Sequence, residues 1–171
     1  MTAERKAKIR QKLSRTRSDL LQYARELTES EWTQPIYTHG EEWTAQDVLR
    51  HLTWSESGMT RLIQHIRQGH GGVSEDFDRD RYNAGGVEKL KEKTPAELMT
   101  MMTENRERTL QILDDLSEDE LAMEGRHAMG EIMSIEAILR IISIHEQQHL
   151  QDLRQALKQP FSYRNIQNSR G

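Results

Sequence analysis

Apolar residues recur every three or four positions along four long segments of this chain, which is the spacing of one face of an α-helix. The segments cover residues 2–28, 44–69, 94–116 and 134–158, and polar connections separate them. No alternating pattern of the kind that predicts a β-strand is longer than a few residues. Helices of about 22–26 residues are roughly 33–39 Å long, a length that suits a four-helix bundle.

Three of these helices begin at recognisable capping residues. Thr94 is followed by Pro95 and then by Glu97, which predicts a capping box with proline in the first helical position. Thr44 and Ser134 are candidate N-caps for the second and fourth helices, because each directly precedes an apolar periodic segment. These residues therefore predict where the last three helices begin.

The connection between the second and third helices is unusually long. Residues 71–93 are more than a tight turn between antiparallel neighbours requires, and they leave room for one short helix. We therefore predict an all-α fold, a four-helix bundle with a long crossover connection between helices 2 and 3. The bundle domain is expected to span residues 1–158. Pro160 ends the last helix, and residues 159–171 are expected to form a flexible C-terminal tail.

Composition narrows the classes of protein that fit this pattern. Of the 171 residues, 35% are hydrophobic and 30% are charged, the net charge is −4, and cysteine is absent. The lack of cysteine excludes disulfides, thiolate zinc sites and a cysteine nucleophile. A pI near 6.0 gives no general attraction to nucleic acid, and a mean hydropathy of −0.86 argues against a membrane span. The chain starts without an apolar signal segment, so we expect it in the cytoplasm.

Two histidines interrupt the apolar stripe of the last helix. His145 and His149 fall where its series of isoleucines and leucines continues, so both imidazoles are expected to point into the core. Imidazoles one turn apart can bind one metal ion, whereas without an ion each needs hydrogen-bond partners in the core. His51 lies on the edge of the apolar face of the second helix, and bundles build metal sites from facing helices. The pattern leaves two interpretations open, a three-histidine metal site or hydrogen-bonded core histidines.

Residues 145–149 also match the H-E-x-x-H motif of zinc proteases. Beyond this motif the extended protease pattern fails, because Asp152 and Gln155 stand where glycine and histidine would be. No strand is visible that could bind a peptide by its edge. We therefore disfavour a protease and expect Glu146 to be a solvated residue at the margin of the helix.

Several other polar or small residues carry weaker signals. Ser55 and Gly58 follow His51 at intervals of about one and two turns, where they either leave a cavity beside a metal or permit close packing of helices. Tyr82 and Asn83 lie in the long connection and are candidates to cap such a pocket.

The remaining charged and imidazole side chains are expected to be solvated or too distant for the site. His65 lies about 21 Å from His51 along the helix axis and cannot share its ion. The connections contain three more histidines, which we expect in solvent: His39, His70 and His127. A solvated helix face is also expected for the basic residues near the start, which are Arg5, Lys6, Lys8, Arg10, Lys12, Arg15 and Arg17.

Three stretches of the sequence resemble the DinB/YfiT-like family of bacterial four-helix metalloproteins. They are WTAQDVLRHL on the second helix, DFDRDRYNAGGVEKL in the long connection, and SIEAILRIISIHEQQHLQDLRQAL on the fourth helix. The resemblance covers about residues 5–158, and its most specific part is one histidine a turn into the second helix combined with His-x-x-x-His in the fourth. It implies a metal triad of His51, His145 and His149 that binds zinc or nickel and has open positions filled by water. Many members of the family form dimers.

The resemblance also implies a class of reaction. Characterised branches resemble transferases and isomerases that depend on low-molecular-weight thiols such as bacillithiol or mycothiol, and other members are described as metal-dependent hydrolases. Because the chain has no cysteine, a thiol would have to come from a diffusible cofactor. We therefore expect a metal-dependent thiol S-transferase or hydrolase that acts on a small electrophilic substrate, with a homodimer as its assembly and no nucleic-acid or membrane partner. The alternative is a non-catalytic metal-binding protein of a stress response.

Overall fold

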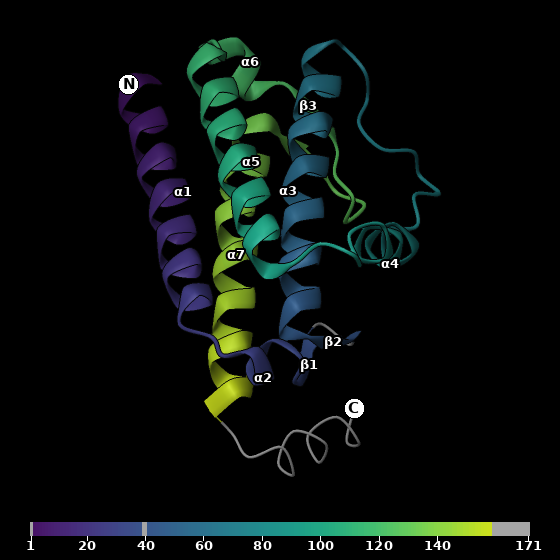
Figure 1. The fold of residues 1–171 in the computed structure, drawn as a ribbon. Helices are drawn as coiled ribbons and strands as arrows, with labels where there is room; N and C mark the ends of the chain where they lie inside the picture. Colours follow the sequence, from purple (N-terminus) through teal and green to yellow (C-terminus); the bar gives the residue numbers. More distant parts are fainter. Residues whose placement is uncertain (1, 39–40, 159–171) are drawn as a thin grey trace.

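Four long helices form a bundle in this computed structural model, which describes residues 2–38 and 41–158 (Figure 1). They are α1 (Thr2–Arg25), α3 (Ala45–Arg67), α5 (Pro95–Asp115) and α7 (Ile135–Lys158). Short helices in the connections are α2 (Glu29–Trp32), α4 (Arg79–Lys89) and α6 (Glu118–Ala122). Two antiparallel hairpins pair β1 (Pro35–Thr38) with β2 (Glu41–Thr44), and β3 (Glu124–Arg126) with β4 (Ile132–Ser134). The four predicted long helices are confirmed, and the hairpins are additions to segments interpreted as polar connections.

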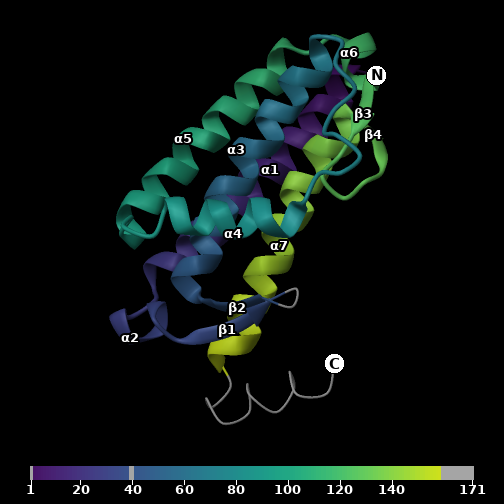
Figure 2. The ribbon, with the colours of Figure 1, turned by 90° about the vertical axis from the view of Figure 1, so that its right-hand side faces the viewer.

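The order of the helices around the bundle differs from their order in the chain. Both α1 and α3 pack against α5 and α7, so α1 and α3 lie at opposite corners. In Figure 1, α1 and α7 run downwards whereas α3 and α5 run upwards. Because α3 and α5 are parallel neighbours, the chain has to return along the bundle between them. Residues 68–94 make this return, and α4 lies across the bundle axis on the way (Figure 2). The predicted crossover is confirmed.

Capping residues fix the starts of the long helices after the first. The side chains of Thr44 and Thr94 accept hydrogen bonds from the amides of Asp47 and Glu97, whose carboxylates accept hydrogen bonds in return from the cap amides. The hydroxyl of Ser134 accepts a hydrogen bond from the third amide of α7, at 3.2 Å. All three predicted caps are confirmed. They set the register of α3 and α7, the two helices that carry the candidate metal ligands.

Two hydrophobic clusters fill the core, one toward the β1–β2 end of the bundle and one toward the α6 end. Between them every long helix turns polar at the same level. The buried polar residues of this layer lie within 16–17 of α1, 51–60 of α3, 105–109 of α5 and 143–149 of α7. The candidate site therefore belongs to a polar layer inside an otherwise apolar bundle.

Within residues 2–38 and 41–158, no helix combines the length and the apolar character that crossing a membrane requires. The predicted tail of residues 159–171 lies outside the described residues, and so does His39.

Candidate metal centre

Three histidines from two antiparallel helices meet in the polar layer. Nε2 of His145 on α7 lies 3.1 Å from Nε2 of His51 on α3 and 3.0 Å from Nε2 of His149, one turn further along α7. One nitrogen of each ring lies within 4.8 Å of the other two. Nitrogens bound tetrahedrally to one zinc ion at about 2.0–2.1 Å are about 3.3 Å apart. The structure thus brings together the three residues that the sequence singled out, at separations a shared ion can bridge.

The surroundings of these rings orient their nitrogens. His51 and His149 are 4% and 1% exposed, while His145 is half-buried. A carboxylate oxygen of Asp152 lies 3.8 Å from Nδ1 of His149, the nitrogen that faces away from the cluster. Carboxylates beside the outer nitrogen of a ligating histidine commonly fix the orientation of its ring. Asp152 is therefore placed to keep Nε2 of His149 directed at the cluster.

The donor set fits a divalent cation. Among the residues that the structure describes, the cluster consists of histidines alone, so it offers three neutral nitrogen donors and leaves coordination positions open. A single ring nitrogen donates or accepts one hydrogen bond. Nε2 of His145 faces the Nε2 atoms of both His51 and His149. A cation between the rings can bind all three nitrogens at once.

The cluster opens into a pocket with a volume of about 780 Å³. One wall follows α3 from His51 to His65, about 21 Å along the axis, and α7 completes it. The opposite wall comes from two connections, residues 72–83 and 127–129, which contribute to the pocket lining. Tyr82 and Asn83 of α4 line this wall, which confirms that the long connection caps the pocket.

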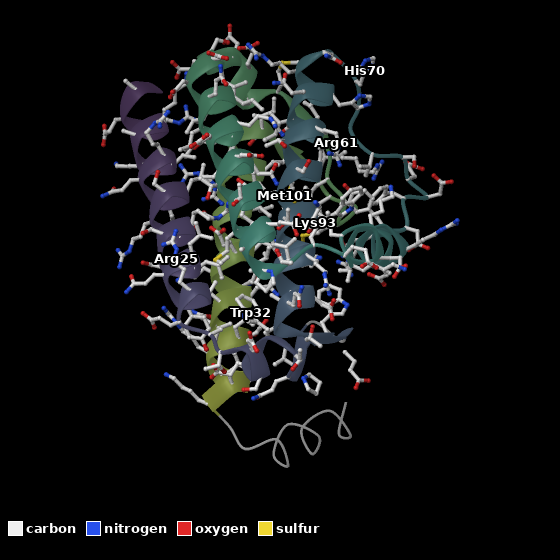
Figure 3. All side chains as sticks on the ribbon, in the orientation of Figure 1. Arg25, Trp32, Arg61, His70, Lys93 and Met101 are labelled. Atoms are coloured by element: carbon white, nitrogen blue, oxygen red, sulfur yellow. The ribbon has the colours of Figure 1, made fainter. Side chains whose placement is uncertain are left out.

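Gly58 lets the long connection approach α3 closely. A methyl group at Gly58 would lie nearer than 3.0 Å to the hydroxyl of Tyr82. One turn further along α3, Arg61 donates a hydrogen bond to the same hydroxyl at 3.1 Å, from the side of α3 that faces the connection (Figure 3). Both interpretations of Gly58 therefore hold, because it lines the pocket and also permits close packing against α4.

The two connections that form the outer wall are joined to each other. The amide of Val73 donates to the carbonyl of Arg126 at 2.9 Å, and the amide of Arg126 donates to the carbonyl of Gly71 at 2.8 Å. Between these bonds, Gly72 has φ +93°, and a side chain there would collide with the backbone of Arg126. The crossover connection is thereby attached to the β3–β4 hairpin.

A network of four buried charges, one from each long helix, lies in the same polar layer as the histidines. Its members are Arg17 of α1, Glu56 of α3, Arg106 of α5 and Glu146 of α7, each 5% exposed or less. The two positive and two negative charges cancel. We call these four residues the charge layer.

Both glutamates of the charge layer are held by the two arginines. Glu146 accepts hydrogen bonds from Nε of Arg17 at 2.6 Å and from Arg106 at 3.1 Å. Glu56 accepts hydrogen bonds from Nε of Arg106 at 2.7 Å, from Thr109 at 2.8 Å, and from Arg17. Burial raises the pKa of Glu56, but the charges of Arg17 and Arg106 outweigh it, so the pKa lies below its ordinary value.

This network corrects two expectations from the sequence. Glu146 is not solvated, because its carboxylate closes the charge layer at 2% exposure. Arg17 is likewise buried, although Lys8, Lys12 and Arg15 are exposed as expected. The network also weighs against the H-E-x-x-H protease interpretation. Both carboxylate oxygens of Glu146 already accept hydrogen bonds within the core and are not directed at a reacting water.

The expectation of a solvated His127 is wrong as well. Its side chain is 4% exposed and lines the pocket. Burial lowers its pKa, and the charge of Glu131 opposes this shift only in part. Its position depends on the β3–β4 hairpin, which the sequence pattern did not indicate. By contrast, His65 and His70 are exposed and stack with ring centroids 4.3 Å apart, and neither joins the cluster.

Solved structures of other proteins share this architecture. YfiT from Bacillus subtilis, described as a probable metal-dependent hydrolase with an unusual four-helix bundle topology, matches with a TM-score of 0.75 and 19% identity over 90% of this chain and 86% of that one. A mycothiol-dependent maleylpyruvate isomerase matches with a TM-score of 0.66 and 20% identity over 90% of this chain, which spans 60% of the isomerase. No curated protein matches the chain. At these identities the structural matches establish the fold.

The family follows from the sequence itself. The model of the DinB superfamily matches residues 12–153, a range that contains all three clustered histidines and most of each long helix. This match agrees with the bundle topology and with the resemblance noted from the motifs on the second and fourth helices. The chain belongs to the DinB superfamily.

Proposed function

We propose that this protein is a metal-dependent enzyme in which His51, His145 and His149 bind one divalent cation, zinc or nickel, beside a pocket for a small-molecule substrate. One observation carries the proposal. Three nitrogen donors, with no fourth ligand from the described residues, lie at one end of a pocket of about 780 Å³. A structural zinc site is closed by four protein ligands, whereas a catalytic site keeps a position open to the substrate.

Two features bear on the nucleophile at this site. They are the charge of the ion and the supply of general bases among the described residues around it. A divalent ion held by neutral imidazoles lowers the pKa of a thiol or water that coordinates it. The described residues around the cluster offer no evident general base, since Glu146 is held by the charge layer. A thiol needs no such base once it is ionised, because the thiolate is itself the nucleophile. We therefore rank thiol S-transfer above hydrolysis, with a diffusible low-molecular-weight thiol as cosubstrate.

The structural neighbours are compatible with both reactions. One is described as mycothiol-dependent, which agrees with the use of a small thiol, and the other as a probable metal-dependent hydrolase. Trp43 packs against His51 with ring centroids 4.7 Å apart and shields one side of the cluster, while Phe77 and Tyr82 enclose the pocket. A substrate bound there would be partly removed from water, which strengthens its electrostatic interaction with the ion.

Cobalt substitution tests the proposal. The protein as purified is first analysed for its metal content, then loaded with Co(II) and titrated with low-molecular-weight thiols. We expect a sulfur-to-cobalt charge-transfer band that disappears in His51→Ala and persists in His65→Ala, whose residue lines the same pocket outside the cluster. Metal binding without any thiol band would remove the transferase assignment and leave hydrolysis or a non-catalytic metal-binding role. A protein that binds no divalent metal would refute the proposal altogether.

A further inference from the structure

The pocket contains a second buried polar group at the end opposite the histidine cluster. His127 belongs to the loop that follows β3, and β3 packs on the far end of α3, where Gly125 contacts the side chain of Ile66. Along α3, Ile66 lies 15 residues after His51, or about 22 Å. The ring of His127 therefore forms the pocket wall at a distance from the candidate metal ligands.

The hydrogen bonds of His127 determine which of its nitrogens carries the proton. Nδ1 accepts a hydrogen bond from the amide of Met129 at 3.3 Å, so Nδ1 is unprotonated. Burial keeps the ring neutral by lowering its pKa. The single proton of a neutral imidazole must then be on Nε2. His127 is thus a hydrogen-bond donor through Nε2–H.

This donor has no acceptor within the described part of the chain. Nε2 is buried, and none of the described residues forms a hydrogen bond with it. Leaving a buried donor unpaired is unfavourable, and such groups in native proteins usually have a partner or a function. Because His127 lines the pocket, a molecule inside the pocket is the group best placed to supply the acceptor.

We propose that Nε2–H of His127 recognises the ligand of this pocket by donating a hydrogen bond to an sp² oxygen at the ligand's distal end. The ligand is then elongated, with its reacting group at the histidine cluster and a carboxylate or carboxamide oxygen at His127. Charged residues of the lining favour the carboxylate, since Arg61 and Arg79 outnumber Asp80. This inference rests on the proposed function, because it takes the pocket to be the substrate site of the metal centre.

Two small probes test the inference separately from the metal chemistry. Hexanoate and hexanamide carry the same alkyl chain and differ in whether the oxygen bears a charge. Each is titrated into the full-length protein, both zinc-loaded and metal-free, while the ring ¹⁵N and ¹H resonances of His127 are followed by NMR. We expect the Nε2–H tautomer without probe and a saturable shift of Nε2 with hexanoate in both forms of the protein.

Variants of His127 provide the matched comparison. His127→Phe keeps a ring but removes the donor, and we expect it to bind hexanoate about tenfold more weakly and hexanamide about fivefold more weakly. His127→Gln retains an N–H donor and should recover part of the affinity. His70→Phe alters an exposed histidine outside the pocket lining and should bind both probes like the unaltered protein.

The outcomes separate the inference from the proposed function. Unchanged affinity in His127→Phe, a probe that shifts only the clustered histidines, or no binding of either probe up to its solubility limit would each overturn the role of His127. The role of His127 would also be overturned if its Nε2–H bonded only to water while a probe occupied the pocket. Loss of metal binding with an intact response of His127 would instead refute the metal-dependent function alone.

Discussion

Each clustered histidine should be needed for metal binding. Replacing His51, His145 or His149 with alanine leaves two imidazoles to hold the ion, and we expect most of the bound metal to be lost on purification. Elemental analysis of each variant measures this directly. His65→Ala is the control, because His65 lines the same pocket without joining the cluster. Full metal content in His51→Ala would show that α3 does not contribute a ligand.

Glu146 should matter for stability rather than for metal binding. Glu146→Gln removes one negative charge from the charge layer and leaves Arg17 and Arg106 insufficiently compensated in the core. Breaking a buried ion pair in this way costs about 3–5 kcal/mol of unfolding free energy. Urea unfolding measures the loss, and metal content at low urea should stay at the level of the unaltered protein. Glu107→Gln, at an exposed position of α5, should change stability by less than about 0.5 kcal/mol. Loss of metal without loss of stability would revive a direct role for Glu146.

The periodicity of apolar residues predicts some residues of the site and misses others. His145 and His149 were recognisable because they interrupt an apolar stripe on their own helix. The same helix gives no sign that Glu146 is buried, since its partners come from α1 and α5, which are distant in the sequence. The burial of His127 was not predicted for a related reason, because it depends on the β3–β4 hairpin. Contacts with residues distant in the sequence therefore determine the burial of Glu146 and His127, which a local pattern cannot predict.

The contact between the two connections of the outer wall should depend on Gly72. Gly72→Ala places a methyl group against the backbone of Arg126 and also strains a residue with φ +93°. We expect a loss of more than about 1 kcal/mol and faster hydrogen exchange at the amides of Val73 and Arg126, which NMR can follow residue by residue. Gly71→Ala is a close control, since nothing lies within 4 Å of a Cβ atom at that position. Equal exchange rates in the two variants would contradict this account.

Among the elements, the four long helices were predictable, whereas the hairpins and the short helices α2 and α6 were not. Thr44, Thr94 and Ser134 marked helix starts because capping requires particular side chains at fixed spacings. The strands contain three or four residues each, which is too few for an alternating pattern to be recognised. Their pairing comes instead from backbone hydrogen bonds and from the helices on which they pack.

Several carboxylates should make the stability of the folded protein depend on pH in the acid range. Hydrogen bonds from Lys93 and from its own cap lower the pKa of Glu97 to about 2, and Arg67 with a second cap does the same for Glu120. The pKa of Glu56 is also lowered. Because unfolded glutamates titrate near 4.5, the stabilisation from these groups is complete above that pH and is lost as the pH falls towards 2.

Thermal unfolding between pH 5 and about pH 2 checks this expectation. The melting temperature should fall steadily over that interval, and Glu97→Gln should show a shallower fall because its side chain no longer titrates. Glu107→Gln, at an exposed position outside these hydrogen bonds, should follow the unaltered protein. Identical slopes for Glu97→Gln and the unaltered protein would mean that this carboxylate has an ordinary pKa in the folded state.

The candidate metal ligands and the outer wall of the pocket belong to different parts of the molecule. Its candidate metal ligands stand on α3 and α7, which are fixed by caps and by the charge layer, whereas its outer wall consists of connections joined at Gly72. Substitutions in those connections change the shape of the pocket and leave the three clustered histidines in place. Under the proposed function, new substrate preferences can therefore be selected from libraries at wall positions such as Phe77, Tyr82 and Met129, while the bundle stays unchanged.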